Sequence, residues 1–151
     1  MPHPIFTQQI DTLIRLRYPA MLGMTDRQFD ETLAPLGQLI PPDRPEPDAA
    51  QGRVPFVLVI NTPATSSAQM LDLVKRQGKQ AIEKLYPKTL NDFSTIAGAG
   101  VPEGDAYLLR DIDRGDATRN VTPDAAYALI ADAGRSPVTI HEGIALLTHY
   151  P

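Results

Sequence analysis

His141 and Arg135 are the two side chains of this sequence whose types and positions best suit chemistry on a bound anion. Arg135 lies in a loop that leads into a predicted helix, and His141 lies in the first turn of that helix. An arginine can hold a carboxylate or phosphate through two parallel hydrogen bonds. A position at a helix N-terminus lowers the pKa of a histidine, which leaves a neutral imidazole able to accept or donate a proton. We therefore take His141 as the candidate acid–base residue and Arg135 as the candidate anion clamp.

Two predicted helix N-termini surround these residues. Thr122 is a good N-cap before Pro123, while Thr139 and Glu142 have the spacing of a capping box. Free backbone N–H groups and the helix dipole favour anions at such ends. The candidate ligand-binding surface consists of the polar residues at these two N-termini: Asn120, Thr122, Arg135, Thr139 and His141.

Each of these residues also has a simpler structural interpretation. The spacing to Thr139 favours Glu142 as a capping residue over Glu142 as an acid–base catalyst. An exposed helix histidine is a common observation, so His141 need not bind anything. Arg135 could pair with Asp132 or with nearby acidic residues as readily as with a ligand.

The sequence predicts no metal site and no cofactor. His141 begins a motif like H-E-x-x-H, but Ala145 occupies the fifth position. His149 follows eight residues later, about 12 Å along a straight helix. Residues 111–122 resemble a calcium-binding loop only at their start, because a threonine stands where the bidentate glutamate is needed. No phosphate-binding glycine loop or nucleophile motif is present.

Composition excludes several functional classes. The chain has 151 residues, no cysteine, no tryptophan and a formal net charge of −4. Disulfides and thiolate chemistry are therefore impossible, and the acidic balance argues against nucleic-acid binding. Neither a signal peptide nor an apolar run of membrane-spanning length is recognisable, so we expect a cytoplasmic protein.

The charge is distributed unevenly along the chain. Residues 75–88 carry five cations and one anion, whereas residues 103–116 carry five anions and two cations. Such segments are either solvated faces or surfaces that dock a partner.

The hydrophobic pattern predicts two helices, a buried strand and a third helix in the first half of the chain. Apolar residues at helical spacing indicate a helix that starts near Phe6 and stops before Pro19. A capping box at Thr25 opens a second, short helix. A proline-rich connector at about 41–53 precedes the continuous apolar run 54–60.

After the strand, Ser66 or Ser67 could cap a helix with Gly78 as its C-terminal glycine. Residues 106–112 and 117–121 are expected to pair as a β-hairpin, and two helices follow, from Pro123 to about residue 133 and from Ile140 to the end. This order predicts a single α+β domain over residues 1–151, with a small, mostly antiparallel sheet and helices packed on it.

The last helix is too apolar to be a frayed end. Leu146, Leu147 and Tyr150 belong on the core or against a partner. An exposed apolar patch there would indicate a homodimer or a protein partner that docks on this helix.

Several segments resemble an uncharacterised, mainly actinobacterial family of domains of unknown function. The segments with the strongest resemblance are Asn120-Val-Thr-Pro-Asp124 and the run from Thr139-Ile-His-Glu-Gly to His149-Tyr-Pro151. The resemblance implies kinship but no activity. It also implies that related proteins continue into a tail rich in Cys, Trp and Gly, which this sequence does not contain.

The sequence thus favours a small cytoplasmic module that binds a small anionic ligand. Because of the resemblance, we expect an accessory or enzymatic role in actinobacterial specialised metabolism. The alternative is a protein–protein interaction or dimerisation module without catalytic activity.

Overall fold

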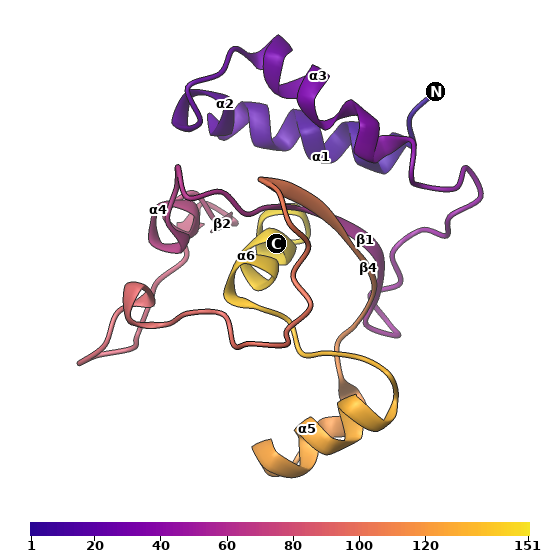
Figure 1. Cartoon of the computed structure of the whole chain (residues 1–151), viewed down its shortest axis with the longest axis vertical. Coiled ribbons are helices and arrows are strands. Elements are labelled where there is room, and N and C mark those ends of the chain that lie inside the picture. The colour runs from indigo at the N-terminus through magenta and orange to yellow at the C-terminus, as the bar shows by residue number, and fades with distance from the viewer.

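The computed structural model describes residues 1–151 and contains six α-helices and two small antiparallel sheets (Figure 1). The predicted α+β class with a small antiparallel sheet is confirmed. Three N-terminal helices form one layer: α1 (Pro4–Arg15), α2 (Tyr18–Met21) and α3 (Asp26–Gly37). The capping box predicted at the start of α3 is present, with Thr25 and Gln28 each bonding the other's backbone N–H.

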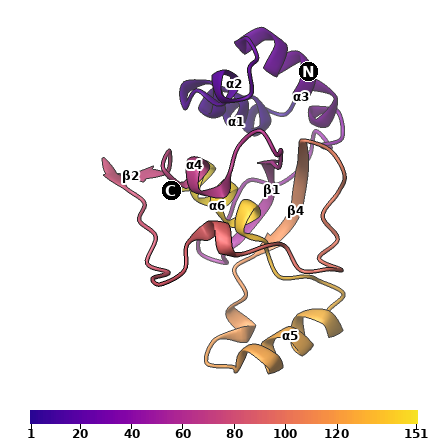
Figure 2. The ribbon, with the colours of Figure 1, turned by 60° about the vertical axis from the view of Figure 1, so that its left-hand side comes forward.

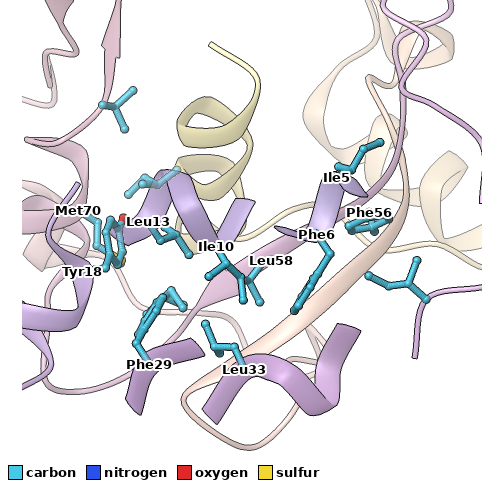
Figure 3. Close-up of a cluster of buried hydrophobic side chains, with 14 residues drawn as sticks. Ile5, Phe6, Ile10, Leu13, Tyr18, Phe29, Leu33, Phe56, Leu58 and Met70 are labelled. Carbon is cyan, nitrogen blue, oxygen red and sulfur yellow. The ribbon is translucent and has the colours of Figure 1, made fainter. Parts of the chain in front are cut away.

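The main sheet pairs β1 (Arg53–Ile60) with β4 (Ala106–Asp113) in antiparallel register, so that Val57 faces Leu109. β1 is buried from Pro55 to Ile60 because helices cover both of its faces. The side chains at 56, 58 and 60 pack in one cluster with α1, α2 and α3 and with Ile144 of α6 (Ile140–His149), and Figure 3 shows Phe56 and Leu58 in this cluster. The side chains at 57 and 59 pack in a second cluster with Tyr107 and with Ala145 of α6. This explains the continuous apolar run in the sequence.

A glutamine takes the place of a third strand beside β1. The Leu58 backbone N–H donates to Oε1 of Gln9 at 2.7 Å, and Nε2 of Gln9 donates to the Phe56 carbonyl at 3.4 Å. The Tyr150 hydroxyl donates to the same carbonyl at 3.2 Å. Buried backbone groups need such partners, so one side chain from α1 and one from the C-terminal end complete the edge of the sheet.

The segment after β1 differs from the prediction. Ser66 caps α4 (Ser67–Leu71) as expected, but the helix ends at Leu71. The chain then forms a hairpin of β2 (Lys75–Arg76) and β3 (Lys79–Gln80). Its two turn residues, Gln77 and Gly78, have φ of 51° and 76°, as a two-residue hairpin turn requires. Gly78 therefore makes a hairpin turn and does not end a helix.

The predicted hairpin between 106–112 and 117–121 is wrong. β4 pairs with β1, and a short 3-10 helix, η2 (Asp116–Thr118), occupies part of the second segment. The segment 117–121 offers only Val121 as a large apolar residue. β1 is apolar from Val54 to Ile60, and β4 can help to bury it, so the long-range pairing is favoured.

Two helices complete the chain. α6 (Ile140–His149) packs on β1 and buries Ile144 and Ala145. α5 (Pro123–Asp132) has no buried residue and projects from the body at the end opposite the α1–α3 layer (Figures 1 and 2). Another 3-10 helix, η1 (Leu90–Asp92), lies in the long segment between β3 and β4. No helix is long and apolar enough to span a membrane.

Candidate functional site

A cleft of 460 Å³ lies between α5, the start of α6 and the segment after η1. Residues 93–99 form one wall, α5 forms another, and the loop 135–139 leads across it into α6. Large apolar side chains dominate the lining: Phe93, Ile96, Tyr127, Ile130, Val138 and Ile140. A few hydroxyl groups, one arginine and one histidine supply the polar functions. This volume and mixture are typical of a pocket for a small molecule.

His141 lines the cleft from the first turn of α6. Its ring is about half buried, and burial lowers the pKa of the imidazole, against the smaller opposing effect of the neighbouring Glu142 carboxylate. The side chain is therefore neutral at pH 7 and can accept a proton or a hydrogen bond. The sequence predicted a lowered pKa from the helix N-terminus, whereas the structure assigns it to burial.

Arg135 lies at the rim of the same cleft, and its side chain is exposed. One guanidinium nitrogen donates to the backbone carbonyl of Asp111 in β4. The Asp111 carboxylate pairs with Arg44, and Arg135 forms no ion pair. A guanidinium has five N–H donors, so most of them remain free for an anion.

The N-terminus of α6 already holds a carboxylate. Thr139 and Glu142 form the predicted capping box, in which the Thr139 N–H donates to Oε2 of Glu142 at 2.8 Å. The Tyr107 hydroxyl donates to Oε1 of Glu142 at 2.9 Å. Burial and this carboxylate raise the pKa of Tyr107. Glu142 is thus a buried structural residue, and it reduces the number of α6 N–H groups that are free for a ligand.

Asn120 and Thr122 do not join this cleft. They lie at the N-terminal end of α5, whereas Arg135 follows its C-terminal end, and ten helical residues span about 15 Å. Thr122 is the N-cap of α5, but its side chain makes no capping hydrogen bond. The two helix N-termini therefore do not converge, and the structure brings together only Arg135, Thr139 and His141.

A family model described as a family of unknown function (DUF5701) matches residues 12–151, from the last turn of α1 onward. The chain belongs to this family. The DUF5701 match includes every residue of the cleft and agrees with the kinship that the sequence motifs indicated. No curated protein and no solved structure matches the chain.

Sequence reasoning missed half of the cleft in this DUF5701 chain. Phe93 and Ile96 belong to a segment without regular structure, and no pattern in the sequence connects them to α5. Tyr127 and Ile130 did carry a signal. α5 is apolar around much of its circumference, and a helix of that kind needs cover on more than one side.

A second feature that the sequence did not reveal is His149 at the end of α6. Neither of its ring nitrogens has a hydrogen-bond partner or any exposure to solvent. Burial lowers the pKa of His149 to about 4, with a weaker opposing effect of the Leu58 backbone. The ring borders a cavity of only 10 Å³, which His141 and Tyr18 also line. Burial likewise raises the pKa of Tyr18 to about 12.

Proposed function

We propose that this protein is a binding module for a small anionic ligand with an apolar body, held in the cleft beside α5. The supporting observation is that Arg135 and His141 line one apolar cleft of 460 Å³. Arg135 would hold the anionic group at the rim, where its guanidinium has free donors. The apolar body would lie against Ile96 and Ile130, away from solvent.

His141 would contribute a neutral imidazole to the bound ligand. A carboxylate or phosphate ester group held by Arg135 presents acceptor oxygens, and a neutral imidazole can donate one N–H to them. The imidazole of His141 could also accept a proton from a bound molecule. No carboxylate lines the cleft beside His141, because Glu142 is committed to the helix cap. Binding, and no particular reaction, is therefore the function that we propose.

A thermal-shift series with matched ligands tests this proposal. The panel pairs medium-chain and aromatic carboxylates and phosphates with the corresponding neutral amides and alcohols. A ligand at a hundred times its Kd stabilises a protein by about 2.7 kcal/mol, or about 5–10 °C at this size. We expect the anionic members to raise the Tm and their neutral counterparts to act weakly.

Three variants locate the binding. Arg135→Ala should abolish the preference for anions, and Ile130→Ser should weaken all members of the panel. Arg15→Ala, an exposed cation on α1 far from the cleft, is the control and should bind as the natural protein does. A preference for anions that persists in Arg135→Ala, or a panel without any shift, would contradict the proposal.

The alternative of a partner that docks on the C-terminal helix has less support. Leu147 is exposed, but Leu146 is partly buried and Tyr150 hydrogen-bonds to β1. Most of the other large apolar residues that are exposed lie on α5 or between residues 82 and 96.

A further inference from the structure

We propose that two copies of this chain associate through a basic arm, residues 75–88, that docks on the outer face of α5 of the other copy. The arm starts in the β2–β3 hairpin and continues into the irregular segment before η1. The outer face of α5 consists of Asp124, Ala125, Ala128, Leu129 and Asp132. The proposal concerns a different surface from the cleft and is independent of the ligand.

The basic arm carries a net positive charge, whereas the chain as a whole is acidic. All four lysines of the chain lie in it, together with Arg76 and only one acid, Glu83. None of its five cations takes part in an ion pair. Between the cations, Ile82 is 73% exposed and Tyr86 is 94% exposed. Large apolar side chains that are exposed together, and are surrounded by charged residues, mark a candidate docking surface.

The outer face of α5 has the complementary composition. Asp124 and Asp132 lie eight residues apart on the same side of the helix, and neither forms an ion pair. Leu129, 48% exposed, and two alanines lie between them. The helix carries no basic residue.

Within one chain, neither the basic arm nor the outer face of α5 has a partner for its charged and exposed apolar side chains. The arm does not fold onto its own α5, since its apolar side chains remain exposed and its cations unpaired. A chain that presents a basic apolar segment and an acidic apolar face complements a second copy of itself. A two-fold axis would make the same contact twice, which is the commonest arrangement among homo-oligomers. Complementary charge would select this pairing over others.

Sedimentation equilibrium of two charge-reversed variants tests the pairing. The arm variant is Lys79→Glu with Lys84→Glu, and the helix variant is Asp124→Lys with Asp132→Lys; all four side chains are exposed. We expect the natural protein to dimerise with a Kd that rises with salt, and each variant alone to raise that Kd by at least about tenfold. An equimolar mixture of the two variants should regain dimers, because at the substituted positions of both contacts in the heterodimer a carboxylate then faces an amine.

The matched control reverses two exposed cations outside the arm, Arg15→Glu with Arg110→Glu, and should leave the Kd unchanged. Circular dichroism and the Tm show that each variant is folded. A monomeric natural protein at every concentration would overturn the proposal. So would dimers that resist both reversals, or a mixture that stays monomeric.

Zero-length carbodiimide cross-linking gives a second test. It joins an amine to a carboxylate in direct contact, and every lysine amine belongs to the arm. We expect a cross-linked dimer in which peptides of residues 79–88 are joined to peptides that contain Asp124 or Asp132. Cross-links confined to monomers, or dimers joined at other carboxylates, would refute this interface.

Discussion

Replacing His149 with leucine is expected to remove much of the acid sensitivity of this fold. The imidazole is buried, both ring nitrogens lack partners, and burial lowers its pKa to about 4. In the unfolded chain the same group has its ordinary pKa of 6.5. As the pH falls below about 6.5, the unfolded chain therefore binds a proton that the folded protein excludes. Protonation then favours unfolding until the pH falls below about 4.

The size of the effect follows from the two pKa values. The difference between 6.5 and about 4 corresponds to about 3 kcal/mol of unfolding free energy, of which about 2 kcal/mol is lost between pH 7 and pH 5. Leucine has a similar size and no titrating group. At pH 7 the variant should be about 1 kcal/mol more stable than the natural protein, because it leaves no buried nitrogen unsatisfied.

Urea unfolding followed by circular dichroism at pH 7, 6, 5 and 4 measures both proteins. Every other titratable group is present in both proteins, so the contributions of these groups cancel in the difference between the two curves. That difference should widen by about 2 kcal/mol from pH 7 to pH 5. Two curves that stay parallel over this range would refute the reasoning, since His149 would then be protonated as easily in the folded protein as in the unfolded chain.

Four further substitutions test the fold by the same unfolding measurement. Gln9→Leu removes the partner of two backbone groups of β1 and should cost about 2–3 kcal/mol; a cost well below 1 kcal/mol would contradict this contact. Tyr107→Phe takes a donor from the buried Glu142 carboxylate and should cost about 1.5 kcal/mol. Gly37→Ala would place a Cβ 2.8 Å from a phenyl ring and should destabilise by about 1–3 kcal/mol, whereas Gly143→Ala meets open space and should stabilise by about 0.5–1 kcal/mol. Equal effects at the two glycines would contradict the packing at α3.

Local signals in the sequence predicted the local structure well. The predicted capping boxes at Thr25 and Thr139 each involve residues three apart, so their side chains meet as soon as the helix forms. Ser66, one of the two predicted caps of α4, also forms such a box. The apolar run of β1 was sufficient to identify a buried strand, because length and β-branched residues separate it from a helix.

Long-range pairing was not predictable from these signals. β4 pairs with β1, about fifty residues earlier in the chain, and not with the nearby segment 117–121. The apolar surface that this pairing buries decides the partner, and proximity in the sequence does not. The same limit applies to the site. Arg135, Thr139 and His141 are close in sequence and meet in the cleft, but the opposite wall at residues 93–99 comes from a segment without a periodic pattern. Asn120 does not line the cleft, because the length of α5 separates it from Arg135.

The side chain of Gln9 also protects the protein against its own most apolar strand. β1 has β4 on one side only, and an unpaired edge on the other side would be a template for strands of neighbouring chains. Gln9 and the Tyr150 hydroxyl occupy hydrogen-bonding groups of that edge, which closes it without a further strand. Loss of this contact should therefore be visible first as aggregation of an otherwise folded protein. At high protein concentration, this aggregation would remove more folded protein from solution than the lost stability would.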